Sequence, residues 1–136
     1  MIMAAWKTWL RQWGPVVTWM AAIFLMSHQP KEAIPVYGVW DWLVKKGAHF
    51  MAYALLAGLA WRARRKEEHE AGKRPYLLPL TLSLLYALSD EAHQSFVPGR
   101  HPSLVDVGID LLGAITTLGL LWGWARFGWD RTKPPV

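Results

Sequence analysis

Four apolar stretches alternate with polar segments along the chain. They run from Trp13 to Met26, Ala48 to Ala63, Tyr76 to Leu88 and Leu104 to Ala125. A helix that crosses ~30 Å of hydrocarbon needs ~20 residues at ~1.5 Å each, and the flanking residues bring every stretch near that length. The pattern therefore predicts four membrane-spanning helices, at about residues 9–27, 46–63, 77–96 and 104–125.

The alternative to membrane spans is a soluble four-helix bundle, which requires a polar position about every 3 to 4 residues along each helix. Residues 111–125 lack this stripe, because their only polar side chains are Thr116, Thr117 and the tryptophan indoles. We therefore predict an all-α fold, a four-helix transmembrane bundle. Pro15 and Pro79 are expected in first turns, where proline costs little because those amides have no intrahelical acceptor.

Length and composition narrow the class of protein further. A chain of 136 residues predicts a single domain over residues 1–136, and the absence of cysteine excludes disulfides, thiolate metal sites and a cysteine nucleophile. The net charge of +5 suits nucleic acid or an anionic membrane, but ten tryptophans favour a membrane interface. The segment Ser27-His28-Gln29-Pro30 has no small-x-small cleavage motif, so the first span is expected to be retained.

Lysine and arginine are distributed unevenly over this topology. Four spans place both termini and residues 62–75 on one side, which carries 11 of the 15 basic residues. By the positive-inside rule this side is cytoplasmic, which predicts a multi-pass protein of the inner or plasma membrane. Residues 62–75 then serve as a topology determinant, and no nucleic-acid partner is expected. The remaining four basic residues face outside: Lys31, Lys45, Lys46 and Arg100.

Polar residues enter the predicted spans near this outer side. Lys46, His49 and Tyr53 fall within about 60° of one another at about 100° per residue, which forms one polar stripe on an apolar helix. We expect this stripe to face the interior of the bundle. The last two turns of the third span, before Pro98-Gly99, carry a second polar group: Asp90, Glu91, His93 and Gln94.

The fourth span adds a third polar group. Ser103 and Asp106 fit the S-x-x-D capping pattern, and Asp106, Asp110, Gly113 and Thr117 follow one another down one face. An ionised side chain on a transmembrane helix costs at least ~2.5 kcal/mol unless it meets water or a partner. Two explanations stay open: ion pairs that hold the helices together, and an outward-facing polar pocket. We favour the pocket, because acceptors outnumber bases and histidines titrate near neutral pH.

Three sequence runs resemble the VanZ-like family of small bacterial membrane proteins. They are Lys45–Tyr53, Ser89–Arg100 and Asp106–Gly113, and the resemblance extends from about Ser27 to Leu121. It implies a four-helix integral membrane protein of the cell envelope, related to an accessory protein of teicoplanin-type glycopeptide resistance clusters, and it implies no known reaction. The family pattern matches nine positions: Lys46, His49, Tyr53, Asp90, Glu91, Gln94, Arg100, Asp106 and Gly113.

Asp110 departs from the family pattern, which usually has asparagine there. The additional carboxyl group leaves open a neutral pair in which Asp106 and Asp110 share a proton.

One functional hypothesis is an enzyme that acts on a lipid-linked or envelope substrate at the outer leaflet. His49 or Glu91 would be the general acid or base, oriented by Asp90 and Asp106. Lys46 and Arg100 would hold an anionic headgroup or a developing negative charge. The predicted substrate-binding residues are therefore Lys46, Tyr53, Gln94, Arg100 and Asp110.

Other classes of function remain as alternatives. The same pocket could bind a lipid headgroup or a lipoglycopeptide without turnover, with Trp40 and Trp42 as an interfacial lid. No cofactor is expected. A divalent metal is the less favoured alternative, because no H-E-x-x-H or H-x-E motif is present. Its ligands would come from His49, Asp90, Glu91, His93 and Asp106.

Transport is disfavoured as a function, because four short spans without a repeat or a broken helix pair give no pathway across the membrane.

Several further positions receive structural interpretations. The Gly119-x-x-x-Gly123 motif is interpreted as a contact within the molecule, and the oligomeric state stays open. Asp41 is expected to cap its helix. His28 and Gln29 either cap the first span or border the pocket, whereas His69 and His101 are expected in solvent.

Overall fold

The structure is a computed structural model that describes residues 2–29, 38–67 and 75–127. Its four helices are α1 (Ile2–Ser27), α2 (Val39–Glu67), α3 (Leu77–Gln94) and α4 (Leu104–Phe127). The described ranges contain no strand. The prediction of an all-helical fold with four helices is confirmed. His69, Lys31 and the C-terminal residues 128–136 lie outside the described residues.

The helices are not identical with the predicted spans. α1 begins seven residues before residue 9, α2 begins seven residues before residue 46, and α3 ends two residues before residue 96. Hydropathy delimits the part of a helix that suits lipid, whereas the helix itself continues as long as its backbone hydrogen bonds do. Beyond Gln94 the chain passes into turns, in which Phe96 donates its backbone N–H to His93 and Gly99 adopts a positive φ of 73°.

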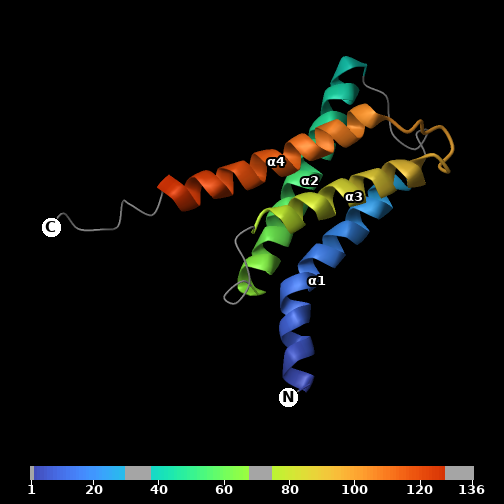
Figure 1. Cartoon of the computed structure of the whole chain (residues 1–136). Helices are drawn as coiled ribbons and strands as arrows, with labels where there is room; N and C mark the ends of the chain where they lie inside the picture. The colour runs from blue at the N-terminus through green and yellow to red at the C-terminus, as the bar shows by residue number, and fades with distance from the viewer. Residues whose placement is uncertain (1, 30–37, 68–74, 128–136) are drawn as a thin grey trace.

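Pro15 lies inside α1, so the prediction that it occupies a first turn is wrong, whereas Pro79 does lie in the first turn of α3. Proline has no N–H, which leaves the carbonyl group of Arg11, four residues earlier, without its helical donor. Arg62 of α2 donates Nη2 to this carbonyl oxygen at 3.5 Å. Figure 1 shows α1 changing direction near its middle, as expected for an internal proline.

α2 is the central helix, since it packs extensively against each of the other three, whereas α3 touches α1 only narrowly. α4 crosses it closely at Gly113 (Figure 1), where a Cβ atom would collide with the backbone of Phe50 and lie 3.1 Å from the backbone nitrogen of Ala54. Further along the same pair of helices, Ala57 and Ala114 are fully buried. Small residues allow helix backbones to approach in this way.

Gly119 and Gly123 do not contribute to this packing. A Cβ atom at either position would meet nothing within 4 Å in the described part of the chain. The prediction that this motif forms a contact within the molecule is therefore wrong for the residues that the structure describes. α4 runs past its neighbours at this end (Figure 1), which agrees with the open space around the two glycines.

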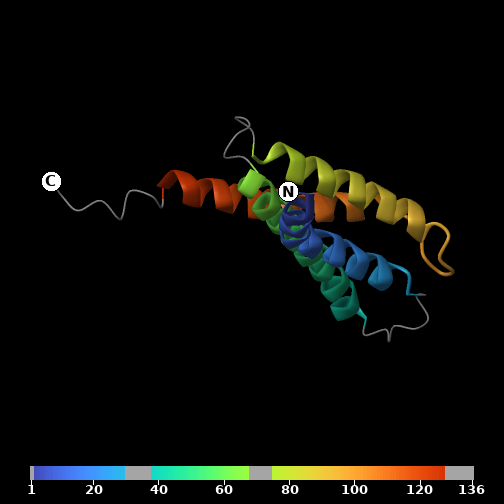
Figure 2. The same cartoon turned by 90° about the horizontal axis from the view of Figure 1, so that it is seen from below.

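Two hydrogen bonds attach α1 to the other helices near its middle. Trp19 donates its indole Nε1 to the carbonyl oxygen of Ala52 in α2 at 2.8 Å. Tyr86 of α3 donates its hydroxyl group to the carbonyl oxygen of Met20 at 2.6 Å. Above these contacts, α1 ends, α2 begins, α3 ends and α4 begins at one end of the molecule, which both views show (Figures 1 and 2). We call this the polar end, because it holds the residues described below.

By length and apolar composition, α4 is a candidate membrane span, and no other helix in the described ranges meets the same criterion. Lys45, Lys46 and His49 lie within α2, and Asp90 and Glu91 lie in the 18-residue α3. These polar residues lower the average hydropathy of the two helices.

Candidate functional site

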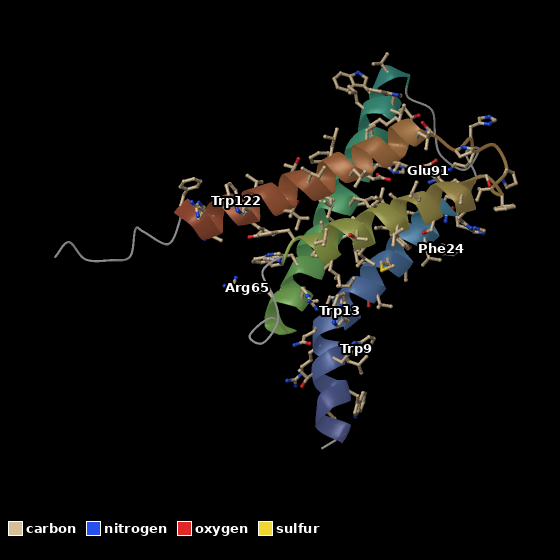
Figure 3. All side chains as sticks on the ribbon, viewed as in Figure 1. Trp9, Trp13, Phe24, Arg65, Glu91 and Trp122 are labelled. Carbon is tan, nitrogen blue, oxygen red and sulfur yellow. The ribbon has the colours of Figure 1, made fainter. Side chains whose placement is uncertain are left out.

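Polar side chains from all four helices meet at the polar end. Figure 3 shows Glu91 of α3 there, together with Phe24 near the end of α1, while Arg65 and Trp122 lie toward the opposite end of the molecule. The following contacts connect the polar residues to one another and to a cavity.

α2 and α4 are joined by two polar pairs. Lys46 donates Nζ to Asp106 Oδ1 in a hydrogen-bonded ion pair, and both side chains are partly exposed. His49 Nδ1 lies 3.1 Å from Asp110 Oδ1, and the Asp110 side chain is only 1% exposed. When Nδ1 donates its proton to Asp110, Nε2 is left as a free acceptor, which is the form of imidazole that a general base requires.

A second cluster joins α1 to α3. Ser27, the last residue of α1, donates Oγ to Asp90 Oδ2 at 2.8 Å, and Gln94 donates Nε2 to the same oxygen at 3.2 Å. Asp90 is 4% exposed and Gln94 is 3% exposed. Sequence reasoning did not select Ser27. The available signal was a small hydroxyl residue that ends an apolar stretch at the depth of the other polar groups.

Glu91 holds the beginning of α4. Its Oε2 accepts the backbone N–H of Ser103 at 2.6 Å. The capping pattern predicts Asp106 in this role, and that prediction is wrong because Asp106 pairs with Lys46 instead. A carboxylate from α3 therefore replaces the one within α4, and its negative charge lies at the positive end of the helix dipole.

Four buried oxygen atoms at the polar end have no hydrogen-bond partner in the described part of the chain: Tyr53 Oη, Asp90 Oδ1, Glu91 Oε1 and Asp110 Oδ2. A buried acceptor without a donor costs about 1–3 kcal/mol, so proteins seldom leave several in one place without a functional reason. The ion pairs and hydrogen bonds among the helices thus leave several buried polar atoms of the described residues without a partner. This result favours a pocket over a purely structural network.

A cavity of about 450 Å³ opens at the polar end, between the end of α1, the first half of α2 and the chain from Gln94 to Asp106. Asp90, Glu91 and Asp110 lie behind its wall rather than on it. The other six predicted site residues line it: Lys46, His49, Tyr53, Gln94, Arg100 and Asp106.

The cavity also has lining residues that were not predicted as part of the site. Asp41 and Lys45 form an ion pair of 2.7 Å at its mouth, beside Trp42, which is 57% exposed. Asp41 was expected to cap α2, but it lies within the first turn of this helix, and its side chain accepts a hydrogen bond from Lys45. His101 lines the cavity and is exposed.

Two histidines considered from the sequence, His28 and His93, contact each other rather than the cavity. His28 Nδ1 and His93 Nε2 lie 3.1 Å apart, and both rings stack near Phe24. Neither histidine lines the cavity. Gln29 borders the site through its backbone, since its carbonyl oxygen accepts Nε of Arg100 at 3.2 Å.

The proposed metal ligands do not converge. Within residues 2–29, 38–67 and 75–127, no three His, Cys, Asp or Glu side chains form a group that could hold a metal ion. The divalent-metal alternative therefore has no geometric support in this part of the chain.

The fold and the site define a helical protein with a polar cavity at one end and a helix that suits a membrane. The family model described as VanZ/LLP1 matches residues 9–126, and the chain belongs to this family. The resemblance noted from the three sequence runs is therefore confirmed over most of the chain. No curated protein and no solved structure matches the chain.

Proposed function

We propose that the chain is a multi-pass membrane protein of the bacterial cell envelope, with both termini in the cytoplasm and the polar end facing outside. Family membership and the candidate span α4 support a membrane location. Lys7, Arg11, Arg62, Arg65 and Arg126 lie toward the end opposite the cavity, which suits the positive-inside rule.

In this setting the cavity acts on a lipid-linked or envelope substrate. The observation that carries this proposal is the pair of His49 and Asp110, in which a buried carboxyl group lies behind an imidazole that faces the cavity. His49 Nε2 would accept a proton from a hydroxyl group or water at the substrate, while Asp110 would fix the ring and stabilise the imidazolium. Arg100 and Lys46 would stabilise the negative charge that develops.

The remaining carboxyl groups act through other residues in this proposal. Asp90 holds Gln94 and Ser27 in place, and Glu91 fixes the start of α4, which carries both Asp106 and Asp110. These two are positioning residues, and Asp106 positions the ammonium group of Lys46.

The test is a comparison of His49→Gln with His28→Gln in a strain in which the gene affects an envelope phenotype. Teicoplanin susceptibility is the first phenotype to measure, because the family resemblance points to it. We expect His49→Gln to lower the effect of the gene on this phenotype at least tenfold, since general base catalysis contributes about 10²–10⁴-fold to a reaction rate. His28→Gln controls for histidine loss outside the cavity. A His49→Gln protein with wild-type abundance and full phenotype would refute the catalytic role.

A second candidate function is binding without turnover of a lipid headgroup or a lipoglycopeptide. Arg100 favours it, because this residue lines the cavity and forms no ion pair with any described residue. Lipid that purifies with the protein and stays chemically unchanged on incubation would support binding over catalysis.

A further inference from the structure

One wall of the cavity is apolar and lies between α1 and α2. Ile23 and Met26 of α1 face Ala48 and Ala52 of α2 across it. The two helices touch where Trp19 bonds Ala52, and toward the polar end they diverge (Figure 1). Met26 is 53% exposed, so this wall continues onto the outer surface of the protein. The opening between α1 and α2 therefore joins the cavity to the surface that hydrocarbon covers in the proposed orientation.

Among the described residues, Arg100 at the cavity has no carboxylate partner. Asp41 neutralises Lys45, and Asp106 neutralises Lys46. Arg100 uses Nε for the carbonyl oxygen of Gln29, and its two terminal nitrogens have no partner among the described residues. A guanidinium group with two free nitrogens matches the geometry of a phosphate, which it binds through two parallel hydrogen bonds.

The inner part of the cavity offers hydrogen-bond acceptors from Tyr53 and Gln94. Tyr53 lines it, is 1% exposed and has an unpartnered hydroxyl oxygen. Gln94 donates one amide N–H to Asp90, and its side-chain carbonyl oxygen remains an acceptor. Behind them, Asp90, Glu91 and Asp110 each keep one unpartnered oxygen. Tyr53 and Gln94 on the wall, with these carboxyl groups behind it, favour a ligand group that donates hydrogen bonds and carries positive charge.

We infer that the cavity binds one membrane phospholipid with a primary ammonium headgroup, of the phosphatidylethanolamine class. Its phosphate lies at Arg100, its ammonium group points toward Tyr53 and Gln94, and its acyl chains leave between α1 and α2. A volume of about 450 Å³ equals about 15 water molecules at ~30 Å³ each, which holds a headgroup but not a whole lipid. The inference rests on the proposed membrane orientation and does not depend on catalysis by His49.

The decisive comparison uses two lipids with identical chains, phosphate and net charge. Phosphatidylethanolamine donates three N–H bonds, whereas phosphatidylcholine donates none. We expect the purified full-length protein to bind phosphatidylethanolamine at least tenfold more tightly in native mass spectrometry, since a hydrogen bond to a charged group contributes about 1.5–3 kcal/mol. Equal binding of the two lipids would overturn the assignment of the headgroup.

Variants separate the three parts of the site. Arg100→Ala should weaken the binding of both lipids at least tenfold. Tyr53→Phe should reduce the preference for phosphatidylethanolamine over phosphatidylcholine. Ala48→Trp should narrow the opening between α1 and α2 and weaken both lipids, whereas Leu120→Trp, at an exposed position of α4 near the other end, should change neither. Wild-type affinity in both Arg100→Ala and Ala48→Trp would contradict the proposed pose.

A soluble headgroup tests the role of the chains. Glycerophosphoethanolamine has the phosphate and the ammonium group without acyl chains, and we expect it to bind at least tenfold more weakly than the lipid. Equal affinity would exclude the route between α1 and α2. If His49→Gln retains lipid preference but loses the envelope phenotype, both proposals stand. If it retains both, only the catalytic proposal fails.

Discussion

The carboxyl group of Asp110 lies behind His49 and has no access to the cavity. One of its oxygens pairs with His49, and the other has no partner among the described residues. Asparagine at this position would keep a carbonyl oxygen for the imidazole. Its amide nitrogen would then replace the oxygen of Asp110 that has no partner among the described residues.

This arrangement predicts different effects for two changes at one residue. Asp110→Asn should retain the envelope phenotype within about tenfold and should not lower stability, because it removes a buried charge and keeps the acceptor for His49. Asp110→Leu should reduce the envelope phenotype as much as His49→Gln does, because the imidazole ring of His49 is no longer fixed. Dose-response curves and detergent melting curves measure both variants. A wild-type phenotype in both variants would show that His49 needs no orientation, and an equal loss in both would show that the charge of Asp110 is required.

At this scale the sequence predicts which residues belong to the site better than it predicts which of them pair with each other. The polar stripes of separate helices select eight of the nine predicted site residues, since each stripe follows from one helical period, whereas Arg100 lies between α3 and α4. The pairing of His49 with Asp110, rather than Asp90 or Asp106, depends on how α4 is rotated against α2, and no single helix contains that information. Ser27 escaped notice for the same reason, because its partner Asp90 is on another helix.

At the scale of the elements, the contact between α2 and α4 depends on Gly113. The backbone of Phe50 occupies the space that a side chain would need there. The contact lies between the paired residues at the polar end and the buried Ala57 and Ala114. It therefore sets the distance at which Lys46 and His49 meet their carboxylates.

We predict that Gly113→Ala destabilises the protein by about 1–3 kcal/mol, since overpacking forces the backbones of α2 and α4 apart. Gly119→Ala is the matched control on the same helix, because a Cβ there meets nothing within 4 Å. The control should be neutral or more stable by up to about 1 kcal/mol, as expected for alanine in a helix. Melting curves of the two variants in one detergent test the difference, and similar losses would refute the close contact.

The helices themselves were predictable, and their ends were not. Apolar runs indicate four helices because hydrocarbon and protein interiors both exclude unpaired backbone groups. The bend at Pro15 was missed because hydropathy places the start of the first span near residue 9, whereas the helix begins at Ile2. Trp6 and Lys7, which precede residue 9, suit a helix as well as they suit an interface.

At the scale of the whole molecule, the two ends of the helices differ in chemistry. The cavity, the carboxylates and the exposed loop residue Phe96 lie at the polar end, whereas Arg65 and Phe127 lie toward the other. In the proposed orientation the polar end faces outside. The sequence predicts this sidedness from the uneven distribution of bases.

The absence of cysteine makes the orientation directly testable. A single Phe96→Cys substitution, at a side chain that is 85% exposed, should react with a membrane-impermeant maleimide in intact cells. Phe127→Cys, which is 71% exposed near the end of α4, should react only after the membrane is opened. Gel-shift labelling reads out both. The reverse pattern would invert the topology and place the cavity in the cytoplasm.

The bend at Pro15 divides α1 into a half that packs against α2 and α3 and a preceding arm. Trp6, Trp9, Leu10 and Arg11 on this arm are exposed. A rigid helical fusion at the N-terminus would therefore extend the arm away from the cavity and leave the lipid entrance unobstructed. Such a fusion would supply the mass and the recognisable outline that electron microscopy needs for a chain of 136 residues.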